Sequence, residues 1–158
     1  MKNILLITSL IAFTFFSCEK PIQTDLTINF TQTVDGAELT TNSMIYTNSA
    51  GEDYDVKTLK YLISDITLHD RNGGSLQLNE VHFIDIFDES TFNFTVEDIP
   101  NNNYDSISYT MGLDAIKNIS NAYYEENWFG QMEWPDMNGG GYHYMKLEGD
   151  FNDSLSGY

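Results

Sequence analysis

Hydrophobic and polar residues alternate along most of the chain from Leu26 onward. Leu26, Ile28 and Phe30 alternate with polar residues, and this period of two is typical of a strand with one buried face. The segment 56–69 differs because it is apolar on both faces, which predicts a long central strand. We therefore predict strands at residues 26–30, 39–46, 56–69, 76–87, 92–96, 107–113 and 142–151.

Turn signals separate these predicted strands. Asp35-Gly36, Asn72-Gly73-Gly74 and residues 100–103 are rich in glycine, asparagine and proline, the residues that turns favour. Short strands and turns at regular intervals predict an all-β fold, an antiparallel β-sandwich, with at most one short helix at 120–126.

The first residues have the pattern of a targeting segment rather than of a folded element. After Lys2, the apolar run Ile4–Phe16 is shorter than a transmembrane helix requires. Ser17-Cys18 follows, and a small residue before a cysteine at this point resembles a bacterial lipoprotein signal. We predict that residues 1–17 are a signal peptide, that Cys18 is lipidated and that residues 18–25 form a linker. The alternative is an ordinary secretory signal with a coincidental cysteine.

Composition narrows the classes of partner. The chain has 24 acidic and 7 basic residues in 158, giving a net charge of −17. Nucleic acid and anionic membrane surfaces require clustered lysine and arginine, so neither is an expected partner. Membrane attachment is expected only through the lipid, which places the protein in the cell envelope, on the outer membrane. Aromatic residues make up 14% of the chain, which argues against disorder. One cysteine allows neither an internal disulfide nor a cysteine-based zinc site.

Carboxylates offer two weaker possibilities. Asp85, Asp88 and Glu89 form the tightest acidic group, and paired acids can hydrolyse glycosidic bonds. The alternative is that these acids are neighbours by chance, because the chain contains so many acidic residues. The segment 70–73 contains calcium-type ligands but lacks the spacing of an EF-hand loop, so a solvated hairpin turn is favoured there.

Histidine and methionine point to a softer metal. On a strand His143 shares a face with Met145, and Trp134 lies just upstream across the glycine turn. A thioether beside an imidazole favours copper, especially Cu(I), over calcium or magnesium. The alternative is that the methionines fill gaps in the core while His143 bonds a backbone carbonyl. The predicted metal ligands are His143, Met145, Trp134 and His82.

The same region resembles a known family. Residues 129–135 read FGQMEWP and residues 139–149 read GGGYHYMKLEG. These two runs resemble the signature of the MbnP-like proteins, which are methanobactin-associated periplasmic copper-binding proteins and are common as Bacteroidetes lipoproteins. Weaker matches occur in the same order earlier in the chain, at residues 26–30, 60–68, 83–85 and 104–114.

The resemblance implies a specific chemistry. Characterised relatives bind copper through two histidines and a tryptophan oxidised to kynurenine, which implies a di-haem peroxidase-like partner. Trp134 is the signature tryptophan and His143 is the nearest histidine. Pro135-Asp136 stands where a histidine two residues from Trp134 would be, so the alternative is that Trp134 is an ordinary core ring.

The resemblance also implies that the domain at residues 26–158 ends early. Relatives continue into further strands, one of which carries a histidine, whereas this chain ends at Tyr158. We expect a C-terminally incomplete sandwich with open strand edges and exposed core residues. The leading hypothesis is a lipid-anchored, extracytoplasmic copper-binding protein that is not an enzyme. The alternative is a metal-free β-sandwich module that binds glycan or a protein partner.

Overall fold

One long strand organises the fold. The computed structural model describes residues 23–78 and 81–152, and within them β6 (Thr58–Asp70) pairs antiparallel along both of its edges. β7 (Ser75–Leu78) and β8 (His82–Asp85) lie along one edge. β10 (Tyr104–Met111) and β11 (Met145–Glu148) lie along the other. The predicted central strand is therefore confirmed.

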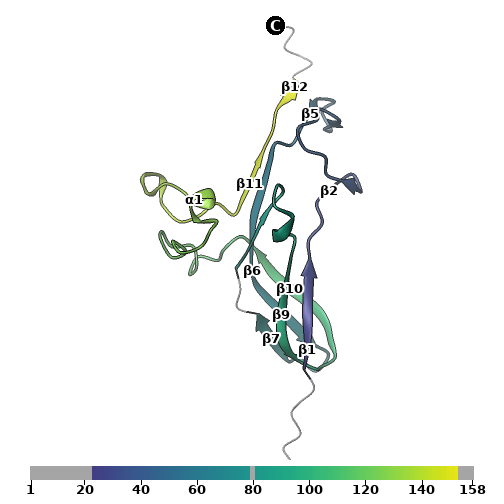
Figure 1. Ribbon diagram of the computed structural model, residues 1–158, viewed down its shortest axis with the longest axis vertical. Coiled ribbons are helices and arrows are strands. Elements are labelled where there is room, and N and C mark those ends of the chain that lie inside the picture. Colours follow the sequence, from purple (N-terminus) through teal and green to yellow (C-terminus); the bar gives the residue numbers. More distant parts are fainter. Residues whose placement is uncertain (1–22, 79–80, 153–158) are drawn as a thin grey trace, which may run out of the picture.

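A second sheet covers one face of this central sheet. β1 (Gln23–Asn29) pairs antiparallel with β9 (Asn93–Pro100), and both lie beside β6 and β10 in Figure 1. Between the two sheets is a buried cluster that includes Tyr61, Ile63, Ile66 and Leu68 from β6. The predicted all-β antiparallel sandwich is confirmed.

A β-bulge at Asp65 keeps these four β6 residues on one face. Partners Ser108 and Thr110 of β10 are two residues apart, whereas their partners Thr67 and Ser64 in β6 are three apart. Asp65 is thus one extra residue, and it takes a left-handed conformation with φ +56°. Side chains of a strand alternate between its two faces. The extra residue therefore changes the positions that face the β1–β9 sheet from odd numbers (61, 63) to even numbers (66, 68).

The opposite face of β6 carries a lobe formed by residues 113–143, which contains α1 (Phe129–Met132). Figure 1 shows this lobe projecting to one side of β6. The lobe has its own buried cluster: Leu62, Phe83, Leu113, Trp128, Met132 and Tyr142. Both of its ends are held by one residue of β6. The N–H of Gly112 donates to the Leu62 carbonyl at 2.7 Å, and the N–H of Leu62 donates to the Tyr144 carbonyl at 3.0 Å.

An ion pair ties the lobe to the bulge. Lys117 of the lobe pairs with the Asp65 carboxylate, and its ammonium holds the pKa of Asp65 below the ordinary value of 3.8. The remaining elements are short: β2 (Thr33–Val34), β3 (Ala37–Glu38), β4 (Tyr46–Thr47), β5 (Asp53–Tyr54), η1 (Glu89–Thr91), η2 (Asp136–Asn138) and β12 (Phe151–Asn152).

Two predicted elements are wrong. Residues 39–45 do not form a strand, because Asn42 has φ +56° and Tyr46 folds back to hydrogen-bond the backbone of Thr40. Residues 120–126 form turns rather than a helix, since Asn121 has φ +64° and breaks the helical path. The α-helix in the described part of the chain begins three residues later, at Phe129.

Two other predicted strands are each divided in two. The segment 76–87 forms β7 and β8, which pair with β6 on either side of the Asp65 bulge. The segment 142–151 forms β11 and β12, interrupted where Gly149 passes close to the backbone of Asp55. The predicted signal peptide and Cys18 lie outside the described residues. Within those residues, no helix has the length and apolarity needed to cross a membrane.

The attachment of the lobe can be tested at Gly112. Its φ is +92°, and an added Cβ would lie 2.5 Å from Cγ of Tyr144. Gly36 is a matched control, because its φ is +81° and nothing lies within 4 Å of its added Cβ. We expect Gly36→Ala to lower the free energy of unfolding by about 1 kcal/mol from backbone strain alone. In Gly112→Ala the new methyl group also collides with Tyr144. The free energy of unfolding, measured by urea denaturation, should therefore fall by about 1–3 kcal/mol more than in Gly36→Ala. Equal losses would contradict this packing of Tyr144 on Gly112.

Candidate functional site

Trp134 and His143 are brought into contact by two short antiparallel segments of the lobe. His143 N–H donates to the Met132 carbonyl at 2.7 Å, and Trp134 N–H donates to the Gly141 carbonyl at 2.8 Å. Residues 139–141 close the turn between the segments, and all three glycines have positive φ. The rings of Trp134 and His143 lie 4.6 Å apart between centroids, edge to face at 76°. The signature region thus places the predicted tryptophan beside the predicted histidine.

The imidazole of His143 makes no hydrogen bond within the described part of the chain. The other two histidines differ. Nε2 of His82 lies 2.7 Å from the Thr91 carbonyl, and Nε2 of His69 lies 2.8 Å from Oγ of Ser108. The alternative that a histidine serves to bond a backbone carbonyl therefore describes His82 rather than His143. Among residues 23–78 and 81–152, no group is hydrogen-bonded to the ring nitrogens of His143.

The surroundings of His143 favour its neutral form. Burial lowers the pKa of its imidazole below the ordinary value of 6.5, and the charge of Lys146 lowers it further, while Glu148 opposes both effects. Metal ions bind only the deprotonated ring nitrogen of histidine. A lowered pKa means that His143 does not have to lose a proton to bind a metal at neutral pH.

Trp134 is not a core ring, so that alternative is wrong. It is 38% exposed, and its Nε1–H donates to the Asn138 carbonyl at 3.0 Å. The core ring of the lobe is Trp128, which is 3% exposed and lies 5.2 Å from Tyr123 and 5.6 Å from Tyr142 between ring centroids. The pattern of the sequence does not indicate this role for Trp128.

The structure places the other two predicted ligands on the far side of the central sheet. Met145 pairs with Tyr61 in the β6–β11 ladder, so it shares a face with Tyr61 and the β1–β9 layer. His82 lies between Phe30 and Phe94, at 5.6 and 4.6 Å between ring centroids. Neither contacts the Trp134–His143 pair. Across residues 23–78 and 81–152, no three His, Cys, Asp or Glu side chains are grouped to hold a metal.

Two lysines of the central sheet hold the helix that precedes the Trp134–His143 pair. Lys60 contacts the side chain of Gln131 and pairs with Asp85 at 3.0 Å, while Nζ of Lys146 donates to the Gln131 carbonyl at 3.3 Å. These contacts hold α1 against the sheet, and α1 ends at Met132, whose carbonyl fixes the backbone of His143. Spacing in the sequence could not indicate this support, because Lys60 and Gln131 are 71 residues apart.

Two of the three acidic groups considered as candidates, Asp85 and Asp88, have structural partners. Asp85 pairs with Lys60, and the Asp88 carboxylate caps η1 by accepting the N–H of Ser90. Oδ1 of Asp70 accepts the N–H groups of Asn72 and Gly74, at 2.7 and 2.9 Å. The Asp70 N–H also donates to the Gly74 carbonyl at 2.9 Å, so the segment 70–73 is a hairpin turn closed by the side chain and backbone of Asp70, as the sequence favoured.

Comparison with known proteins gives one match. A protein-family model described as MbnP matches residues 23–157, which is most of the chain. No curated protein and no solved structure matches.

The protonation of His143 provides a test of this environment. In an NMR titration its ring should lose its proton below pH 6.5, because burial and Lys146 disfavour the charged form. Lys146→Gln should move the midpoint upward, whereas Lys57→Gln, at a lysine paired with Asp150, should not. The unfolded chain takes up this proton more readily, so the free energy of unfolding should fall as the pH drops below 6.5. A midpoint above 6.5 would show that the ring is neither buried nor close to Lys146.

Proposed function

Because the chain belongs to the MbnP family, we propose that it is a lipid-anchored, extracytoplasmic protein that binds copper through His143. In this proposal it is a binding protein rather than an enzyme, and copper is its cargo. The observation that carries the proposal is the imidazole of His143, which lies against Trp134 and makes no hydrogen bond within the described residues.

The chemistry of the pair suits a soft cation. Neutral imidazole is a good ligand for copper, and the net charge of −17 raises the local concentration of cations. One imidazole is an incomplete ligand set, and the family resemblance implies that Trp134 supplies the next donor after oxidation to kynurenine. Trp134 is 38% exposed, so an oxidising partner of the di-haem peroxidase type has access to it.

Copper titration tests the role of His143. We expect His143→Ala to weaken binding of Cu(I) or Cu(II) at least about tenfold, since loss of one good ligand costs more than about 1.4 kcal/mol. His69→Ala is the matched control, because it removes an imidazole that bonds Ser108 on the sheet. Circular dichroism of each variant shows whether the fold is kept. Equal copper affinity for the parent protein and both variants would refute a site at His143.

Mass spectrometry of the natively expressed protein tests the anchor and the oxidation separately. We expect a mature chain that begins at Cys18 and carries lipid, together with conversion of Trp134 to kynurenine, in which the indole gains an oxygen and loses one carbon as formate. Trp134→Phe should remove the oxygen and leave the lipid unchanged. A mature chain that begins elsewhere would refute the anchor, and an unmodified Trp134 would refute the kynurenine donor. Neither result would affect the test of His143.

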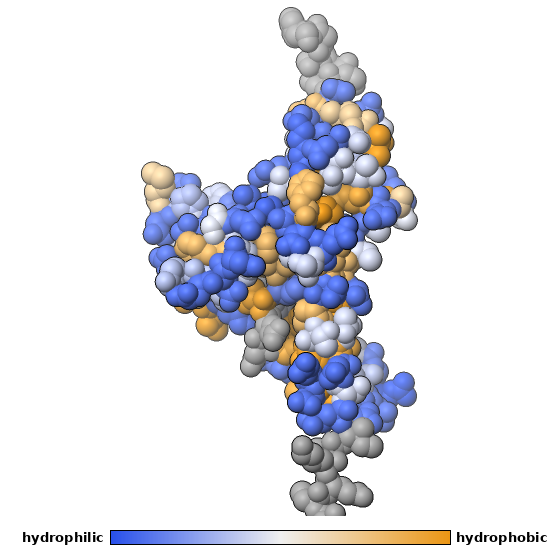
Figure 2. Space-filling view, in the orientation of Figure 1, coloured by the Kyte–Doolittle hydropathy of each residue, from blue (hydrophilic) through white to orange (hydrophobic). Residues whose placement is uncertain are grey.

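The exposed apolar surface favours a second candidate function, the binding of an extended protein segment. Among the described strands, β1 pairs only with β9 and β10 only with β6, so each has a free backbone edge. Figure 2 shows hydrophobic patches interrupting a mostly hydrophilic surface. Apolar side chains line two adjoining hollows between β1 and the β10–β11 edge: Ile107, Tyr109, Met111, Met145 and Leu147. A strand added here would gain both hydrogen bonds and apolar burial, and it would remain bound in the presence of a chelator.

A further inference from the structure

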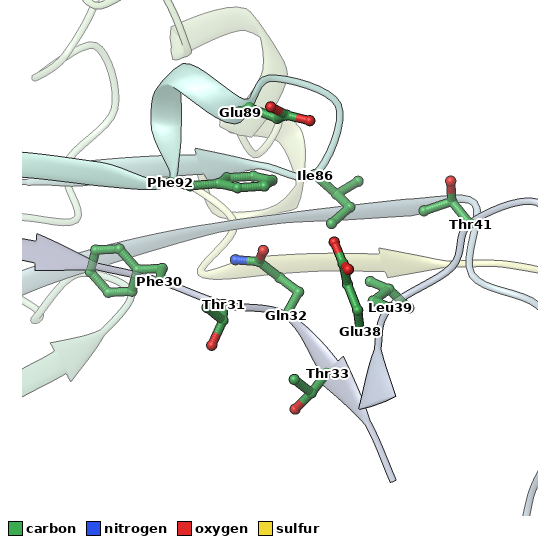
Figure 3. A pocket seen from close by; sticks show the side chains of 10 residues that line it. All are labelled: Phe30, Thr31, Gln32, Thr33, Glu38, Leu39, Thr41, Ile86, Glu89 and Phe92. Atoms are coloured by element: carbon green, nitrogen blue, oxygen red, sulfur yellow. The ribbon is translucent and has the colours of Figure 1, made fainter. Parts of the chain in front are cut away.

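A pocket of about 560 Å³ lies away from the lobe, where β1 gives way to the β2–β3 hairpin. Figure 3 shows it between that hairpin and the segment around η1, and the lobe contributes none of its lining residues. The volume falls within the range of small-molecule sites. The chemistry of its lining indicates which class of molecule fits.

Gln32 is the polar group at the centre of the pocket. It is only 9% exposed, its backbone carbonyl accepts the N–H of Leu39 at 2.9 Å, and its Nε2 donates to the Tyr61 hydroxyl at 3.0 Å. The remaining atom, the carbonyl oxygen Oε1, has no hydrogen-bond partner among the described residues, and Figure 3 shows the amide within the pocket. No buried side-chain nitrogen or oxygen among the described residues lacks a partner, so Oε1 is open to solvent from the pocket. The pocket therefore presents an acceptor to a ligand that donates a hydrogen bond.

Two carboxylates reinforce this preference. Glu38 and Glu89 line the same pocket, and neither carboxylate has a partner in the described part of the chain. In Figure 3 the Glu38 carboxylate points into the space beside Gln32 and Ile86. No lining residue is basic, so an anion would meet repulsion and a cation would meet attraction.

The rest of the lining is part polar and part apolar, because Thr31, Thr33 and Thr41 also belong to it. The rings of Phe30 and Phe92 and the side chain of Ile86 form the wall beside these oxygens. An alkyl chain packs well on such a wall, and aromatic rings attract a cationic head. We propose that this pocket binds a small primary alkylammonium, whose N–H groups donate to Gln32 and whose charge is balanced by Glu38 and Glu89.

The test uses 1,4-diaminobutane as the probe, in isothermal titration calorimetry with the whole protein. We expect saturable binding at millimolar concentration or below, and no binding of 1,4-butanediol, which has the same chain length without charge. Glu38→Gln should weaken diamine binding about tenfold, the usual effect of losing one charge-assisted contact. His143→Ala should leave the affinity unchanged, which separates this site from the copper site.

Glu125→Gln is the matched control for long-range charge. Glu125 is exposed on the lobe, and its replacement changes the net charge by the same amount. Unchanged affinity in this variant, together with loss in Glu38→Gln, would support the pocket. Equal loss in both would show that the acidic surface attracts the diamine without a site. Binding of the diol as tight as the diamine, or no saturation by the diamine, would also overturn the proposal.

Discussion

The fold depends on burying both faces of β6. Leu62 and Ser64 face the lobe and are fully buried, while Ile63 and Ile66 face the β1–β9 sheet at 3% and 2% exposure. A regular strand of this sequence would turn Ile66 and Leu68 away from the core that holds Tyr61 and Ile63. The extra residue at Asp65 prevents this, because it reverses the alternation at the required position. Asp65 adopts its left-handed conformation while its carboxylate is held by Lys117, so the bulge and the attachment of the lobe stabilise each other.

The candidate copper site depends indirectly on the burial of both faces of β6. Its two rings do not belong to the sheet but to segments of the lobe that pair with each other. The sheet fixes them through α1, which Lys60 and Lys146 hold at Gln131. Lys146 therefore has two effects: it supports the helix that positions the backbone of His143, and its charge adds to the effect of burial, which lowers the pKa of the imidazole.

The sequence predicted the elements whose pattern is local. The turn at Asn72-Gly73-Gly74 and the strand that contains Leu26 and Ile28 are found where glycine and alternation place them. The contact between Trp134 and His143 also followed from a local motif with a glycine turn. The position of Met145 could not be predicted in the same way. Its face is set by pairing with Tyr61, which lies 84 residues earlier in the sequence, and not by its spacing from His143. The pocket at Gln32 was not recognisable either, since its lining comes from segments separated by about fifty residues.

The two hydrogen bonds at Leu62 have a further consequence for how this architecture can vary. The lobe leaves and re-enters the sheet at the N–H and carbonyl of one residue, so its ends are already adjacent in space. The entropy of closing a loop grows only with the logarithm of its length, so an insertion whose ends are fixed in this way tolerates lengthening at little thermodynamic expense. The segment 113–143 can therefore change in length or sequence at little cost to the register of the sandwich.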